Sequence, residues 1–86
     1  MDELVFEKKV SLRVSIENLV QEGIEYAKEF SDETKGEQIP WWDIMMASGE
    51  YYDHGYFDAV AEDEIFEVEK KITEVCTKLY NEKMGF

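Results

Sequence analysis

The chain has few residues of the kinds that carry catalysis or covalent cross-links. Its 86 residues include one cysteine (Cys76), one histidine (His54) and one proline. A single cysteine excludes an intramolecular disulfide, and we expect Cys76 to be a small buried side chain in a reducing compartment. His54 has no second His or Cys at ligand spacing and no nucleophile at a recognisable spacing. The sequence therefore predicts neither a metal site nor catalysis at His54.

Several other motifs are missing. The sequence has no glycine-rich phosphate loop and no Cys/His cluster, so no cofactor is expected. No apolar run approaches the roughly 20 residues that a bilayer span requires. Asp2 and Glu3 oppose the basic start of a signal peptide. Together these absences predict a non-catalytic, cytoplasmic protein that does not bind membranes.

Positive charge is absent from residues 37–69, which hold ten Asp and Glu residues and seven of the twelve aromatics. The whole chain has 21 acidic residues against 9 Lys and Arg, a net charge of -12. A surface of this sign repels nucleic acid and anionic membranes, so direct binding to either is not expected. A basic protein surface is the complementary partner.

Hydrophobic periodicity predicts a mostly helical α+β domain. Residues 4–14 alternate between apolar and polar side chains, which is typical of a half-buried strand. Over residues 16–30 the apolar side chains recur at intervals of three and four residues, which predicts a helix. Gly23 inside this helix indicates a close packing contact. At 86 residues we expect one small domain: one N-terminal strand, or a small two-stranded ribbon, packed on about three helices, the last one long.

The second half is predicted to contain a polar loop and two further helices. Residues 31–39 are polar around a central glycine, which indicates a solvated loop. Pro40 suits the first position of a short helix over residues 40–48. Asp58 is placed to cap a long helix over residues 58–83, in which acids crowd the first half and lysines the second, matching the helix dipole.

Three alternatives stay open at the level of the sequence. Residues 50–57 are compatible with a tight hairpin or an interhelical turn, and we favour the interhelical turn. One of Trp41 and Trp42 belongs to the core, and the other is at least partly exposed. The N-terminal strand needs a partner, either residues 51–57 or the same strand of a second copy, so a homodimer is possible.

The acidic stretch is the candidate functional site. Aromatic anchors inside an anionic rim suit docking on a basic groove, because the charges orient the encounter and the buried rings supply most of the affinity. Carboxylates arrayed along a helix also imitate a run of phosphates, so we expect a nucleic-acid-binding protein or a nuclease as the partner that is bound and blocked. The predicted contact residues are Trp42, Glu50, Tyr51, Tyr52, Asp53, Tyr56, Asp58, Glu62, Asp63, Glu64, Glu67 and Glu69.

In its size, its acidity and its lack of a catalytic motif, the chain resembles the small inhibitors that bacteriophages make against host defence or transcription proteins, anti-CRISPR proteins among them. The resemblance implies an inhibitor of the DNA-mimic type that acts in the cytoplasm of a bacterial host. It rests on overall properties of the chain and matches no particular inhibitor family. It therefore assigns no residue roles.

Residues 8–30 (KKVSLRVSIENLVQEGIEYAKEF) resemble the opening of ribbon-helix-helix regulators and antitoxins. In that family an N-terminal strand pairs with its twofold mate, and the ribbon enters the major groove. The resemblance implies that the bases are faced by Lys9, Ser11 and Arg13, and the core by Val10, Leu12 and Val14. It covers about a quarter of the chain, and a long acidic loop follows where the family has a short turn. An antitoxin-like variant would bind DNA with this strand and a basic toxin with the acidic half.

Overall fold

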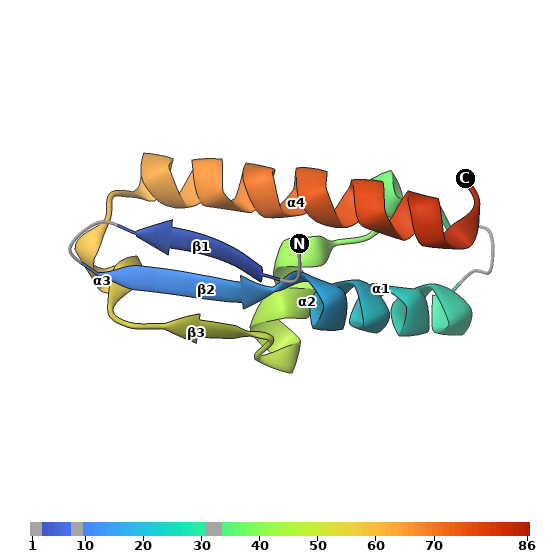
Figure 1. The fold of residues 1–86 in the computed structure, drawn as a ribbon, viewed down its shortest axis with the longest axis horizontal. Helices are drawn as coiled ribbons and strands as arrows, with labels where there is room; N and C mark the ends of the chain where they lie inside the picture. The colour runs from blue at the N-terminus through green and yellow to red at the C-terminus, as the bar shows by residue number, and fades with distance from the viewer. Residues whose placement is uncertain (1–2, 8–9, 31–33) are drawn as a thin grey trace.

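The computed structural model describes residues 3–7, 10–30 and 34–86. Lys9 and the beginning of the predicted polar loop lie outside the described residues. The described residues form a mostly helical α+β fold, with a three-stranded antiparallel sheet at one end of the molecule and α1 at the other (Figure 1). The molecule measures 40 × 22 × 19 Å, and the long last helix, α4 (Glu62–Met84), runs along its length. The predicted fold class is therefore confirmed.

Two strands occupy the stretch that the sequence predicts as one strand over residues 4–14. β1 (Glu3–Glu7) and β2 (Ser11–Ser15) pair antiparallel, so the two-stranded ribbon is the correct form of the prediction and the single strand is wrong. β3 (Tyr51–Asp53) pairs with the other edge of β2, giving the order β1-β2-β3. The partner strand therefore comes from the chain itself. Neither alternative for residues 50–57 is correct, because Tyr51–Asp53 form a strand and Tyr56 begins a short helix, so the stretch is neither an interhelical turn nor a hairpin.

The hairpin keeps the apolar face that the alternation predicts. Leu4 lies opposite Val14, and Phe6 lies opposite Leu12. Residues directly opposite each other in an antiparallel pair share one side of the sheet. This face is turned toward the core, because Leu12 and Val14 are fully buried. The alternation of apolar and polar residues is therefore in phase in β1 and β2.

α1 (Ile16–Phe30) follows β2 without a linker and has the predicted bounds. Its buried residues recur at the helical spacing: Ile16, Leu19, Val20, Gly23 and Ala27. Gly23 lies against Trp41 so closely that a Cβ at position 23 would overlap the indole ring. The predicted packing contact at Gly23 is confirmed, and its partner is Trp41.

α2 (Trp41–Ser48) begins after Pro40 and ends at Gly49, whose φ of 73° gives the left-handed conformation common after a helix end. Trp41 is only 1% exposed, whereas Trp42 is half-buried. Trp41 is therefore the core tryptophan, which settles the alternative that the sequence left open.

The second part of the predicted loop is solvated at Lys35, Glu37 and Gln38, but Gly36 and Ile39 are buried. The short 3-10 helix η1 (Gly36–Gln38) lies against α4. The Gly36 N–H donates to Asn81 Oδ1 at 2.8 Å, and the Gly36 carbonyl accepts from Trp41 Nε1 at 3.0 Å and Thr77 Oγ1 at 3.3 Å. These bonds satisfy the N–H and the carbonyl of the buried Gly36 and fasten the loop to α4.

α4 begins four residues later than predicted. A short helix, α3 (Tyr56–Ala59), precedes it and contains Asp58, so Asp58 does not cap the long helix. The buried stripe of α4 consists of Val68, Ile72, Cys76 and Tyr80. Cys76 is buried as predicted, and burial raises the pKa of its thiol to about 12.

Candidate functional site

The first two turns of α4 carry the densest group of predicted carboxylates. Five predicted acids lie here: Glu62, Asp63, Glu64, Glu67 and Glu69. Glu64 and Glu69 are half-buried, and the other three are exposed. Acids in a first helical turn meet the partial positive charge of the helix N-terminus, so they also stabilise the helix. Lys70 ends this acidic segment, which is about 12 Å long at a rise of 1.5 Å per residue.

Phe66 stands among these acids, although it was not among the predicted contact residues. It is 64% exposed. Its neighbours at three and four positions along the helix share its side, and three of them are acidic: Glu62, Asp63 and Glu69. With Glu69, Lys70 and Thr73 it lines a hollow of about 200 Å³. We call Glu62, Asp63, Phe66, Glu67 and Glu69 the α4 surface.

The predicted aromatic contacts are less exposed than expected. Tyr56 is 5% exposed and belongs to the core, so we correct its assignment as a contact residue. Trp42 and Tyr51 are half-buried, and the ring of each meets Phe57 in a T-shaped contact at 5.8 and 5.9 Å. Tyr52 alone among the four predicted aromatic contacts is fully on the surface, at 71% exposure.

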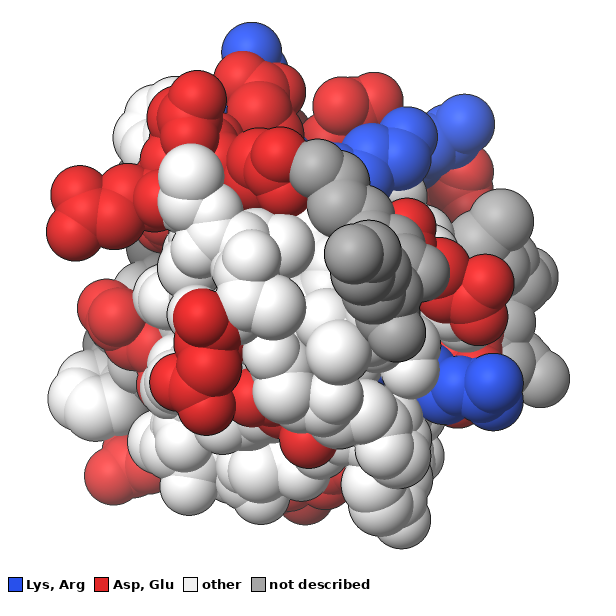
Figure 2. Space-filling view, turned by 90° about the vertical axis from the view of Figure 1, so that its left-hand side faces the viewer, with Lys and Arg blue, Asp and Glu red and all other residues white. Residues whose placement is uncertain are grey.

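The other predicted acids have separate places in the fold. Asp53 Oδ1 accepts hydrogen bonds from the N–H groups of Tyr56 at 2.6 Å and Phe57 at 3.4 Å, so Asp53 satisfies the start of α3. Asp58 is exposed on α3, next to the start of α4. Glu50 precedes β3 and is half-buried. Figure 2 shows the end of the molecule that contains α3, where Asp and Glu side chains lie around uncharged residues and Lys and Arg side chains lie at the top and right of the view.

β2 does not provide the geometry that the ribbon-helix-helix resemblance implies. Lys9 lies outside the described residues, and Ser11 and Arg13 lie on the face opposite to the core. β2 is the central strand, with β1 and β3 on its two edges, so it has no free edge for a twofold mate. Arg13 Nη1 also lies 3.8 Å from Glu3 Oε1. The ribbon between two chains is therefore not available to β2 in this fold.

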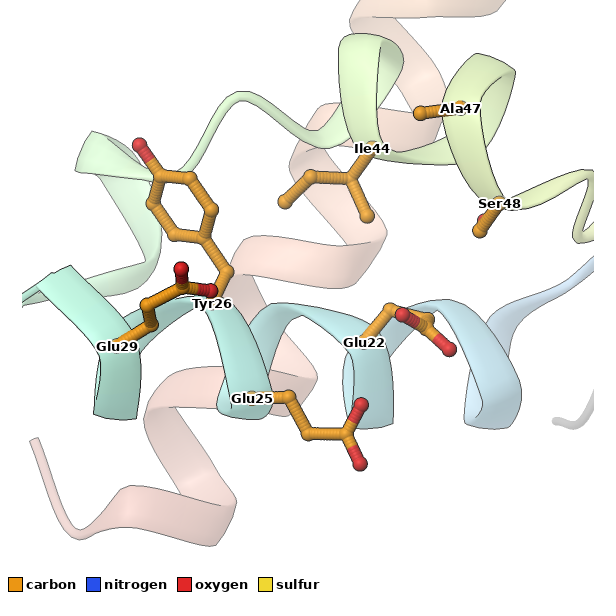
Figure 3. Close-up of a pocket in the computed structure, with 7 residues that line it drawn as sticks. All are labelled: Glu22, Glu25, Tyr26, Glu29, Ile44, Ala47 and Ser48. Carbon is orange, nitrogen blue, oxygen red and sulfur yellow. The ribbon is translucent and has the colours of Figure 1, made fainter.

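A second acidic surface, which the sequence analysis missed, lies between α1 and α2 (Figure 3). It is a hollow of about 360 Å³. Its lining residues are Glu22, Glu25, Tyr26, Glu29, Ile44, Ala47 and Ser48. The spacing of the glutamates on one side of α1 was visible in the sequence, but the position of α2 beside them was not. We call this hollow the α1–α2 groove.

The described residues offer no group of His, Cys, Asp and Glu side chains that could hold a metal ion. His54 lies in the turn after β3, where its backbone N–H donates to the Ser11 carbonyl at 2.9 Å. Within the described ranges, no helix combines the length and the apolar character needed to cross a membrane. Comparison of the chain with models of protein families, with curated proteins and with solved structures found no match.

Proposed function

We propose that this protein is a non-catalytic acidic protein that binds and blocks a basic surface on another protein through the α4 surface. The observation that carries the proposal is the exposed ring of Phe66 among carboxylates on a helix. The surrounding residues 37–69 contain no Lys or Arg. A solvated helix face usually mixes charges more evenly and does not expose a phenylalanine, whereas the helical neighbours of Phe66 are three acids and one cation, Lys70.

Ring and carboxylates have different roles in this proposal. Burying the side chain of Phe66 against a partner contributes about 1.5–2 kcal/mol, because apolar surface leaves water. An exposed ion pair contributes only about 0.2–1 kcal/mol. Phe66 therefore supplies much of the affinity, while Glu62, Asp63 and Glu67 speed the encounter and select a basic partner.

The partner class that we propose is a nucleic-acid-binding protein or a nuclease. Its basic groove is built to hold phosphates, and carboxylates can occupy the same positions. The α4 surface extends over about 12 Å, so it fills a short groove and competes with a short stretch of nucleic acid. This activity is that of a DNA-mimic inhibitor, and we propose it for this chain as a phage-encoded, anti-CRISPR-like protein.

The test is a pull-down from a nuclease-treated bacterial lysate with four forms of the tagged protein. The first is unchanged, the second is E62Q/D63N/E67Q, the third is Phe66→Ser, and the fourth is the control E7Q/E74Q/E82Q. Both triple variants change the net charge from -12 to -9 by removing three carboxylates, so they differ only in where the charge is lost. The control acids are all exposed and lie outside the α4 surface.

We expect one basic protein to be captured by the unchanged protein and the control, and to be lost from the other two variants. Added nucleic acid should compete for that protein. Equal capture by all four forms, or equal loss from both triple variants, would contradict the assignment to the α4 surface. Retention of specific DNA in a sample without nuclease would contradict the proposed partner class.

A further inference from the structure

We propose that the α1–α2 groove is a second docking surface, and that its occupant is a basic amphipathic helix of a protein partner. The groove shares no residue with the α4 surface. This inference therefore does not depend on the proposed function, and each can fail separately.

The floor of the groove is apolar. Ile44 reaches from α2 into the space between the two helices, and Tyr26 rises from α1 toward α2 (Figure 3). Ala47 adds a small exposed side chain on α2. Beyond Tyr26, the ring of Phe30 lies 4.6 Å away and is 65% exposed. These four side chains offer a seat for the apolar face of a helix, as in other helix-in-groove complexes.

The residues that line the groove include three carboxylates, which form its rim, and no Lys or Arg, because Lys28 of α1 is not among them. Glu22, Glu25 and Glu29 are spaced by three and four along α1, where like charges repel one another and destabilise a helix. Two ion pairs among the described residues lie away from this rim, between Arg13 and Glu3 and between Lys83 and Glu17. Cations from a partner can therefore relieve the repulsion between these three carboxylates.

α2 adds negative potential at one end of the groove. The helix ends at Ser48, and the last carbonyls of a helix carry a partial negative charge that favours cations. Ser48 and Glu22 both line the groove. A Lys or Arg side chain placed there meets a carboxylate and a helix C-terminus together.

The spacing of the rim matches a helix as the occupant. Glu22 and Glu29 are seven residues apart, about 10 Å along the axis of α1. A partner helix laid along α1 repeats this spacing when its Lys and Arg residues recur at three, four and seven positions. Its apolar residues then face Ile44 and Tyr26, while its cations face the rim. The apolar floor and the acidic rim of the groove therefore both favour a basic amphipathic helix.

The experiment uses the full chain and two synthetic peptides of about 18 residues. One peptide places leucines on one helical face and lysines and arginines on the other, and the second has the same composition in scrambled order. Binding is measured by fluorescence anisotropy, and the contacts are mapped by amide chemical-shift changes. The protein variants are E22Q/E25Q/E29Q, Ala47→Trp, the α4 variant E62Q/D63N/E67Q and the control E7Q/E74Q/E82Q.

We expect the amphipathic peptide to bind more tightly than the scrambled one and to shift the amides that line the groove. Losing three rim ion pairs in E22Q/E25Q/E29Q should weaken binding roughly tenfold. Ala47→Trp should weaken it without a change of charge, because the indole fills the hollow. The α4 variant and the control should weaken it much less. Equal weakening by the three triple variants, or shifts confined to other surfaces, would overturn the proposal.

Discussion

The two halves of α4 differ in what they contact, although they form one continuous helix. In the C-terminal half, Thr77 and Asn81 bond to Gly36, and the Tyr80 hydroxyl donates to the Thr34 carbonyl at 2.8 Å. The ring of Tyr80 also meets Trp41 edge-on at 5.8 Å. In the N-terminal half, residues 62–73, the buried side chains are those of Val68 and Ile72, both in its last two turns.

This difference separates stability from the proposed function. The C-terminal half is held by hydrogen bonds and by the largest buried side chains of the molecule, Trp41 and Tyr80. The N-terminal half extends from that anchor and exposes Phe66 with its carboxylates. Substitutions in the C-terminal half should therefore change the free energy of unfolding, and those in the N-terminal half should change binding to the partner.

The largest effect on stability is expected from Trp41→Ala. It removes a buried indole that packs on Gly23 and Tyr80, and such truncations cost about 3–5 kcal/mol. The measurement is urea unfolding followed by circular dichroism. Trp42→Ala is the matched control, and its half-buried ring should cost clearly less. Equal losses for the two tryptophans would contradict the assignment of Trp41 to the core.

Alkaline pH should weaken the anchored half through Cys76. Because burial raises the pKa of this thiol to about 12, the folded protein keeps its proton at a pH where the unfolded chain, with a thiol pKa of about 8.5, has lost it. The free energy of unfolding should therefore fall as the pH rises from about 9 toward 12, by up to about 1.4 kcal/mol per pH unit. Cys76→Ala should show a shallower slope in the same titration. An identical slope would contradict the contribution of the thiol.

Asn81→Ala tests the bond between α4 and the loop. The change leaves the Gly36 N–H without its acceptor and also removes the donor to Glu37 Oε1 at 2.9 Å, so we expect a loss of about 1–2 kcal/mol. Asn18→Ala, at an exposed position of α1, is the control and should cost less than about 0.5 kcal/mol. A loss no greater than that of the control would show that the loop is not held by Asn81.

The smallest effect on stability is expected from Phe66→Ser. The ring is exposed, so its removal should change the free energy of unfolding by less than about 0.5 kcal/mol. Thermal unfolding by calorimetry measures this change directly. A destabilisation above about 1 kcal/mol would mean that the N-terminal half of α4 is anchored as well, and the contrast between the halves would be lost.

Local patterns made part of the fold predictable from the sequence. The apolar residues of 16–30 follow the helical spacing throughout, so the bounds of α1 could be predicted from the sequence. The strand break was missed, because the sequence between β1 and β2 contains no Gly, Pro or Asn and the apolar pattern of the two strands stays in phase. β3 is three residues long, and its partner is nearly forty residues earlier in the chain. Such pairing leaves little local signal.

The site was predictable only as a charge pattern. The absence of cations from residues 37–69 drew attention to the start of α4, where three exposed acids lie. Phe66 could have been found as the aromatic that falls out of phase with the stripe from Val68 to Tyr80. Tyr56 was misjudged because its burial depends on tertiary packing, in which its ring lies 6.5 Å from that of Phe6. The α1–α2 groove depends on how two helices pack, which no local pattern records.

The contact between Gly23 and Trp41 also constrains how the sequence can change over time. Any side chain at position 23 would occupy the space of the indole, so the two positions cannot vary independently. A descendant chain could replace most of its surface and still keep this fold, provided that a larger residue at 23 arrives together with a smaller one at 41. Distant relatives should therefore be recognisable by paired substitutions at these positions rather than by overall identity.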